Sequence, residues 1–311
     1  MENVSGAYDE RLIQKYGERS FMYTEYPNLR FWSKTNDAEF RHALKSFLLH
    51  DKDMPFLLYI HIPHCHKQCL FCTCEVIISS KYDEVKRYLT YLYQEINLFR
   101  KFFESIGVTP NIREVHFGGG SPTYLHEEEF DELVHHLRTI VDFSHLEECA
   151  IEIDPRHVKP ERMRYYAKKG INRISFGLQD FDPLVQKAVD RVQPAFLVER
   201  LLTPPLKKLF TNGVNFDIIC GLPHQTVETI RKTAERVVQL APDRVCFNYL
   251  HMRPDIFPHQ LLMESLPSNR ERKILFKTAS EILEQGGYVR VAYDHFALPA
   301  DDVAQARSGG K

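Results

Sequence analysis

Four of the seven cysteines in this 311-residue chain fall within ten residues of one another. They are Cys65, Cys69, Cys72 and Cys74, and the first three follow the spacing C-x3-C-x2-C. Three thiolates on one short loop can bind a single metal centre, because soft sulfur ligands favour zinc, copper(I) or an iron–sulfur cluster. The cysteine group therefore predicts a metal site.

The spacing of the cysteines discriminates among these metals. Structural zinc usually takes four ligands from two separate knuckles. This chain has no second knuckle, because Cys149, Cys220 and Cys246 are isolated in apolar runs. A disulfide framework is not expected either, since a chain with 43% hydrophobic residues can form a stable core without disulfide bonds. Three thiolates on a four-iron cluster would leave one iron open to a small molecule.

An apolar, β-rich run at residues 56–62 leads directly into the cysteines, which places them on a loop at the carboxyl end of a strand. Further strands are expected at residues 114–117, 149–154, 173–178, 215–220 and 244–249. Helices are expected between and after them, at residues 82–103, 127–141, 160–169, 183–192, 196–210, 226–240 and 268–285. Within residues 196–210, Thr203-Pro-Pro205 predicts an interruption of the helix. This alternation predicts an α/β fold with a parallel sheet, either doubly wound or curled into a barrel.

Glycines and polar residues lie near the ends of the later strands. Gly118–Gly120 follow the second strand, where the absence of a Cβ lets a ligand approach the backbone. The polar residues are Glu152, Asp154, Gln179, Asp180, Arg191 and Asp217. We expect Glu152 and Asp154 on alternate faces, so that only one serves a site. Considered one at a time, Asp180 is expected to cap a helix and Arg191 to form an exposed ion pair. Asp217 is expected to accept a buried hydrogen bond.

The order of these motifs resembles a known family. C-x3-C-x2-C-x-C preceded by Tyr59-Ile-His-Ile-Pro63 is similar to the oxygen-independent coproporphyrinogen III oxidase (dehydrogenase) family of the radical S-adenosylmethionine (SAM) superfamily. The Gly-Gly-Gly-Ser-Pro turn, Glu152 in Ile-Glu-Ile-Asp-Pro and the segment Tyr293–Ala297 extend the resemblance along almost the whole chain. The superfamily implies a partial (β/α)6 barrel, here with an N-terminal helical extension.

The resemblance also implies roles for single residues. The cluster ligands would be Cys65, Cys69 and Cys72. Tyr59, Gly119 and Glu152 would contact the SAM on the [4Fe–4S] cluster. Positions that line a second SAM in the family are matched by Phe71, Gly120, Ser121, Gln179, Arg191, Asp217 and Leu250. His61 and Cys74, together with Tyr59, would lie near the reaction centre. The expected cofactors are thus one [4Fe–4S] cluster and two SAM molecules.

Some positions depart from the family pattern. Relatives usually read Arg-Tyr-Thr-Ser-Tyr-Pro where this chain has Phe21–Pro27, so that Met22 replaces an arginine. An arginine can bind both oxygens of a propionate carboxylate and a methionine cannot. Thr73 and Glu75 stand where glycine and asparagine are usual, and Leu250 replaces an alanine. These changes bear on the substrate rather than on the cluster.

Three segments are expected. Residues 1–52 would form the N-terminal extension over the active site, residues 53–298 the barrel and residues 299–311 the start of a truncated C-terminal segment.

Net charge is −2 and there is no basic stripe, so no nucleic-acid partner is expected. No apolar run reaches membrane-spanning length. Free cysteines that stay reduced indicate the cytoplasm, and a monomer is expected.

The resemblance implies an anaerobic oxidoreductase of haem biosynthesis. It would convert two propionates of coproporphyrinogen III to vinyl groups, giving protoporphyrinogen IX. An electron donor such as flavodoxin or ferredoxin would reduce the cluster. SAM would then split into methionine and a 5′-deoxyadenosyl radical that abstracts hydrogen from the propionate side chain, followed by loss of carbon dioxide and one electron. Alternatives are a class C methyltransferase, an anaerobic haem-opening enzyme and a non-catalytic haem chaperone.

Overall fold

An eight-stranded sheet in the order β1-β4-β5-β6-β7-β8-β10-β9 forms the centre of the computed structural model, which describes residues 31–310. Its first six members are β1 (Phe56–Ile62), β4 (Ile112–Gly119), β5 (Glu148–Ile153), β6 (Arg173–Gln179), β7 (Val214–Cys220) and β8 (Arg244–Tyr249). Each pairs in parallel with the next. The predicted set of six parallel strands is confirmed. Because the order ends at β1 and β9, which do not pair with each other, the barrel is partial.

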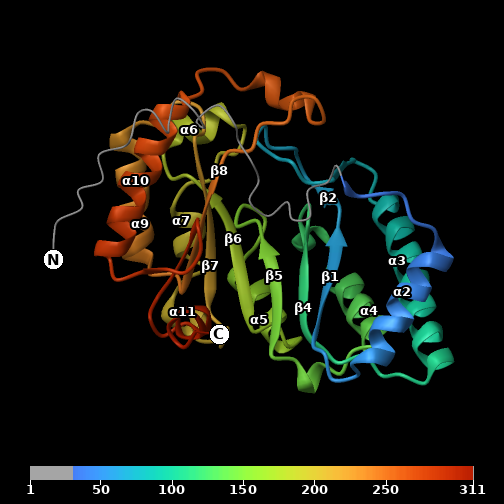
Figure 1. Ribbon diagram of the computed structural model, residues 1–311. Helices are drawn as coiled ribbons and strands as arrows, with labels where there is room; N and C mark the ends of the chain where they lie inside the picture. Colours follow the sequence, from blue (N-terminus) through green and yellow to red (C-terminus); the bar gives the residue numbers. More distant parts are fainter. Residues whose placement is uncertain (1–30, 311) are drawn as a thin grey trace.

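Helices cover the outer face of this curved sheet, and the parallel strands all point toward the same edge (Figure 1). The helices are α2 (Asp37–His50), α3 (Asp83–Ile106), α4 (Glu127–Leu137), α5 (Pro160–Lys168), α6 (Pro183–Ala188), α7 (Phe196–Glu199), α8 (Pro204–Lys207), α9 (Val227–Leu240), α10 (Asn269–Gln285) and α11 (Asp302–Ser308). Short 3-10 turns occur at η2 (Pro122–Tyr124), η3 (Phe143–His145) and η4 (Pro258–Leu262). Among the described residues, no helix is long and apolar enough to cross a membrane.

Two short strands were not expected from the sequence, and one expected helix is divided in two. β10 (His295–Ala297) adds to β8 in the antiparallel sense, and β9 (Val289–Arg290) adds to β10. The helix expected at residues 196–210 is divided into the short helices α7 and α8, with the break next to the interruption predicted at residues 203–205. Pro204 and Pro205 cause the break, since proline lacks a backbone N–H and disfavours the helical conformation in the residue before it.

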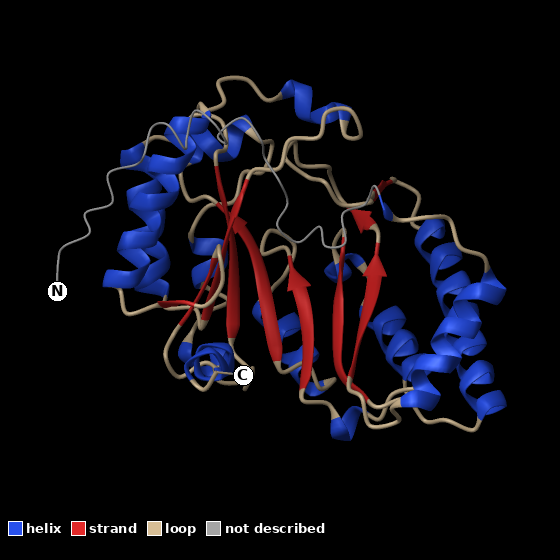
Figure 2. Ribbon diagram, viewed as in Figure 1, coloured by secondary structure: helices blue, strands red, loops and turns tan. Residues whose placement is uncertain are grey.

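The two faces of the sheet carry different chemistry. One hydrophobic core lies between the strands and the outer helices, with buried side chains such as Ile60, Phe117, Ile151, Phe176, Phe216 and Phe247. Successive residues of a strand point to opposite faces. The residues that alternate with the core positions therefore face the inside of the barrel, and many of them are polar, including His116, Ser175 and Asp217. Figure 2 shows the open, curved shape of the sheet around this interior.

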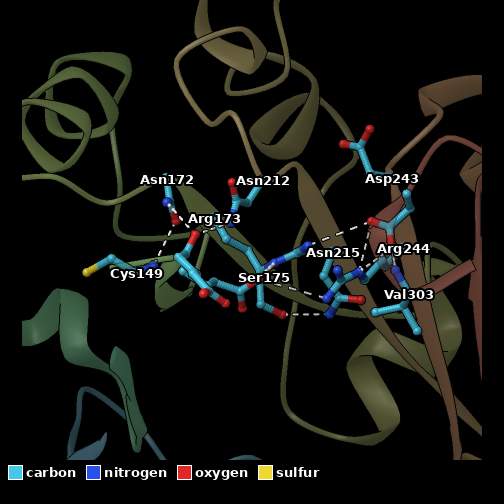
Figure 3. Close-up of polar contacts among 12 residues, drawn as sticks. Cys149, Asn172, Arg173, Ser175, Asn212, Asn215, Asp243, Arg244 and Val303 are labelled. Carbon is cyan, nitrogen blue, oxygen red and sulfur yellow. Dashed lines mark hydrogen bonds and ion pairs between the residues drawn. The ribbon is translucent and has the colours of Figure 1, made fainter. Parts of the chain in front are cut away.

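An ion-pair network closes the end of the barrel where the strands begin (Figure 3). Arg173 Nε donates to Glu148 Oε2 at 2.6 Å, and Arg244 Nε donates to Asp301 Oδ1 at 2.8 Å. The Asp301 side chain is only 3% exposed, and it also accepts a hydrogen bond from the backbone N–H of Val303. Asp301 thus caps α11 and fixes this helix to the base of the barrel.

Part of the predicted N-terminal extension cannot be compared with the structure. The departure at Met22 and the rest of Phe21–Pro27 lie outside the described residues. Within the described part of residues 1–52, α2 begins after a capping box in which Asn36 and Glu39 exchange hydrogen bonds.

Candidate active site

The carboxyl ends of the parallel strands open into a cavity of about 450 Å³. Most of the predicted site residues line it: Cys65, Cys69, Phe71, Cys72, Cys74, Gly119, Gly120, Ser121, Glu152, Gln179, Arg191, Asp217 and Leu250. A larger open groove of about 800 Å³ lies beside residues 138–144 and contains none of the predicted site residues. Cavity volume alone would therefore point to the wrong place, whereas the convergence of polar strand ends locates the site.

Tyr59 and His61 do not line the cavity, but they pack directly against its glycine turn. A Cβ on Gly118 would lie 2.8 Å from the Tyr59 hydroxyl, and one on Gly119 would lie 2.8 Å from the His61 ring. The Tyr59 ring stacks on the ring of His116, with centroids 5.6 Å apart. Burial and the nearby Glu152 carboxylate raise the pKa of Tyr59, so this phenol keeps its proton.

The glycine turn fits tightly against the cysteine loop. A Cβ on Gly120 would lie 2.7 Å from the Pro63 carbonyl oxygen and 3.0 Å from Cys65 Sγ. Gly119 has a φ of +115°, which L-residues with a side chain rarely adopt. The backbone N–H of Gly120 donates to the Ile62 carbonyl at 2.8 Å. Glycine is therefore required here by space and by conformation, which leaves backbone groups accessible beside the thiols.

All four cysteines of the loop are free thiols. Cys65 lies in the short strand β2 (His64–Cys65), which pairs with β3 (Ile77–Ile78), while Cys69 is buried and Cys74 is exposed. A single zinc ion would need its sulfur ligands within about 4 Å of one another. Across residues 31–310, no three His, Cys, Asp or Glu side chains gather closely enough to hold one metal ion.

A segment after β8 holds the cysteine loop from the other side of the cavity. Gln260 Nε2 donates to the Phe71 carbonyl oxygen at 3.2 Å, and His259 Nε2 donates to the Cys72 carbonyl oxygen at 2.8 Å. Neither contact was predictable from the sequence, because the two segments lie almost 190 positions apart and neither contact follows a local spacing rule.

Arg191 is buried, so its interpretation as an exposed ion pair is wrong. Its Nη2 donates to the Gly177 carbonyl at 2.6 Å, and its Nη1 lies 3.5 Å from Asp154 Oδ2. Asp154 also accepts hydrogen bonds from Arg156 Nε at 2.9 Å and Nη2 at 2.6 Å. Burial alone would raise the pKa of Asp154, but the Arg191 charge and the Arg156 hydrogen bonds hold it well below the usual range.

The expectation that Glu152 and Asp154 face apart is also wrong, since both line the cavity. Residues two apart on a strand point to the same face, which is the periodicity that the expectation misapplied. Glu152 pairs with His116, whose Nε2 lies 3.2 Å from Oε1 of the carboxylate. His116, Arg156, His259 and Gln260 are site residues that sequence reasoning did not identify.

The two remaining acidic residues are hydrogen-bond acceptors. Asp217 accepts from Ser175 Oγ at 2.8 Å and from Asn215 Nδ2 at 2.9 Å, as its simplest interpretation predicted. Burial, reinforced by the Glu152 charge, raises the pKa of Asp217 to about 6. Asp180 does not cap a helix, because Asp182 caps α6. Asp180 instead accepts buried hydrogen bonds from Thr233 and Gln225.

Gln179 adds a further feature that suits a bound ligand. It has a φ of +68°, and the β6–β7 register shifts beside it. Its Oε1 atom is buried without a hydrogen-bond partner, and so is Nε of Arg191. Buried polar atoms normally have partners. The residues that carry these two atoms, Gln179 and Arg191, line the same cavity as the thiols.

Comparison with known proteins identifies the kind of site. A family model described as the radical SAM superfamily matches residues 59–237. The chain belongs to the radical SAM superfamily. Oxygen-independent coproporphyrinogen III oxidases from Salmonella typhimurium and Escherichia coli are each 36% identical to it over 97% of its length. The one from Helicobacter pylori strain J99 is 35% identical over 93%.

The structural comparison agrees with this radical SAM assignment. The structure described as coproporphyrinogen III oxidase from Escherichia coli, a radical SAM enzyme, superposes with a TM-score of 0.86 at 32% identity. The match covers 97% of this chain and 67% of that chain. The chain spans 65% of the length of the Salmonella and Escherichia relatives. The predicted superfamily and partial barrel are confirmed.

Radical SAM membership implies a [4Fe–4S] cluster and SAM, and the residues present fit both groups. Three free thiols with the superfamily spacing line one cavity, next to a glycine turn that no larger residue could form. The polar side chains of Gln179 and Arg191 line the same cavity. The donor set suits an iron–sulfur cluster, because thiolates are its usual protein ligands.

Proposed function

We propose that this chain carries the barrel of an oxygen-independent coproporphyrinogen III oxidase, which converts two propionates of coproporphyrinogen III to vinyl groups in haem biosynthesis. The similarity to the Escherichia coli enzyme, which reaches 97% of the chain at a TM-score of 0.86, carries this proposal. The cysteine loop and strand-end residues quoted for the resemblance lie at one cavity, which supports the same activity.

Cys65, Cys69 and Cys72 are proposed to hold the cluster. When bound and reduced, the cluster supplies the electron that cleaves SAM. The other residues bind and orient: Glu152 and the Gly119 backbone line the cavity beside the thiols, with Tyr59 packed behind them. His61 and Cys74 are proposed to lie near the reacting groups. His61 is held there by a hydrogen bond from its Nε2 to the Glu75 carbonyl at 3.0 Å.

A second SAM molecule is proposed in the same cavity. The residues proposed for it are Phe71, Gly120, Ser121, Gln179, Arg191, Asp217 and Leu250, which all line the cavity. The polar side chains of Gln179, Arg191 and Asp217 in this lining suit a polar ligand. The proposal also includes a tetrapyrrole substrate and a flavodoxin or ferredoxin as electron donor. The protein is proposed to be a monomer in the cytoplasm.

Product analysis tests this function. The protein is reconstituted anaerobically with iron and sulfide and then incubated with SAM, dithionite and coproporphyrinogen III. Protoporphyrinogen IX together with 5′-deoxyadenosine is the expected outcome. A methylated or ring-opened tetrapyrrole would instead assign the chain to a related radical SAM reaction. Tight haem binding without any turnover of SAM would make it a haem chaperone.

A further inference from the structure

We propose that Arg156, held in place by Asp154, donates an N–H···S hydrogen bond to Cys69 and so raises the reduction potential of the cluster. This inference rests on the proposed function, since it takes Cys69 as a cluster ligand. Arg156 is not among the residues to which the resemblance assigns a role. Arg156 lies in the loop after β5, 87 positions away from Cys69 in the chain.

The geometry fixes the Arg156 guanidinium beside one sulfur atom. Its Nη2 lies 3.9 Å from Cys69 Sγ, at the long end of the range for hydrogen bonds to sulfur. The same group is bound through Nε and Nη2 to the carboxylate of Asp154. A two-point contact of this kind sets the plane of an arginine as well as its position. The Arg156 side chain is only 16% exposed, so water screens its charge weakly.

A second guanidinium approaches the same sulfur. Arg191 Nη1 lies 3.6 Å from Cys69 Sγ. Cys69 is also the buried member of the three proposed ligands, at 6% exposure. Two cations and the single anion Asp154 leave a net positive charge beside this thiol. Cys65 and Cys72 have no guanidinium hydrogen bond among the described contacts, so the asymmetry singles out one corner of the proposed cluster.

This charge arrangement has a direct redox consequence. Reduction potentials of iron–sulfur clusters depend on net charge, on hydrogen bonds to the sulfurs and on solvent exposure. Reduction adds one negative charge, which a nearby buried cation stabilises more than it would in water. Arg156 therefore makes the cluster easier to reduce. Replacing Arg156 does not leave the Asp154 carboxylate without a cation, because Arg191 remains 3.5 Å from it.

An anaerobic redox titration followed by electron paramagnetic resonance tests the inference, using dithionite and protein reconstituted without SAM. Arg156→Leu should lower the equilibrium constant for one-electron reduction at least tenfold, which corresponds to about 59 mV. Arg156→Lys should fall between the wild type and Arg156→Leu, because lysine keeps the charge and loses the planar fork. Arg164→Leu is the matched control, since Arg164 is an exposed arginine on α5 and should leave the midpoint unchanged.

Iron content and thermal unfolding are measured on each protein, and Arg156→Lys alone carries the test if Arg156→Leu does not fold. An unchanged midpoint in a variant that binds a full complement of iron would overturn the inference and leave the proposed function intact. A variant with lower SAM affinity and an unchanged midpoint potential would also overturn the inference, since Arg156 would then bind SAM rather than tune the cluster. A wild-type protein that takes up no cluster would refute both proposals.

Discussion

Gln260 donates a hydrogen bond from Nε2 to the backbone carbonyl of Phe71 at 3.2 Å, across 189 positions of sequence. The same amide donates to the His251 carbonyl at 2.9 Å and accepts from the Arg253 N–H at 2.7 Å. Its side chain is fully buried, at 0% exposure. One glutamine therefore ties the cysteine loop to the segment that follows β8.

Replacing this glutamine should loosen the cysteine loop. Gln260→Leu removes the three hydrogen bonds that this side chain makes to the backbone of Phe71, His251 and Arg253, and each lost bond costs about 0.5–1.5 kcal/mol. We expect faster amide hydrogen exchange in residues 66–76 and a lower stability. Gln285→Leu, at an exposed position on α10, should change neither. Unchanged exchange in the loop of Gln260→Leu would show that the contact does not hold it.

The tight turn beside Cys65 should not tolerate a side chain. Gly119→Ala adds a Cβ 2.8 Å from the His61 ring at a φ of +115°. Gly287→Ala is the matched control, because its φ is also positive, at +93°, but nothing lies within 4 Å of its Cβ position. Backbone strain of about 1 kcal/mol is common to both variants. Urea unfolding should show a clearly larger loss of stability for Gly119→Ala than for Gly287→Ala. Equal losses of stability would mean that the turn has room for a Cβ.

Asp180 should make the protein less stable as pH rises. Burial raises its pKa from 3.8 to about 6, so between these values the folded chain holds a proton that the unfolded chain has released. Stability from this group is thus complete below pH 3.8 and is lost as pH rises through 6. The difference of roughly two pKa units corresponds to about 3 kcal/mol.

Urea unfolding at pH 5 and pH 8 measures this effect in Asp180→Asn. The stability of the variant relative to the wild type should improve at the higher pH, because asparagine cannot ionise. Asp53→Asn, at an exposed position, serves as the control and should show no such trend. A pH-independent difference between Asp180→Asn and the wild type would contradict the raised pKa.

The base of the barrel should depend on Asp301. Asp301→Ala removes the nearly buried partner of Arg244 and the cap of α11. Breaking such a pair typically costs about 3 kcal/mol or more. Asp302→Ala, in the first turn of α11 but exposed, should cost far less. Thermal unfolding compares the two, and similar melting temperatures would show that the network in Figure 3 contributes little.

The strands were predictable almost to the residue, for a physical reason. A parallel strand covered by helices reads as a dense apolar run, and β1 and β8 match their predicted bounds. The short antiparallel β9 and β10 have only two and three residues, too few for a periodic pattern. The break between α7 and α8 was predictable from Pro204 and Pro205, because proline lacks a backbone N–H and disfavours a continuous helix.

The position of the site was predictable because carboxyl ends of parallel strands meet at one edge. Contacts that depend on register were not. His116 reaches Glu152 from a neighbouring strand, where its backbone partner is Ala150 rather than Glu152. Arg156 and Gln260 contact the cysteine loop across long stretches of sequence, so no spacing rule indicates them.

Iron and sulfide content after anaerobic reconstitution tests the central claim most directly. The wild type should bind about four irons per chain with sulfur-to-iron charge-transfer absorbance, as expected for three thiolates on a [4Fe–4S] cluster. A variant combining Cys65→Ala, Cys69→Ala and Cys72→Ala should bind almost none. Cys149→Ala, a buried cysteine on β5, should bind as much as the wild type. Full iron content and unchanged absorbance in the triple variant would contradict the assignment of the cysteine loop.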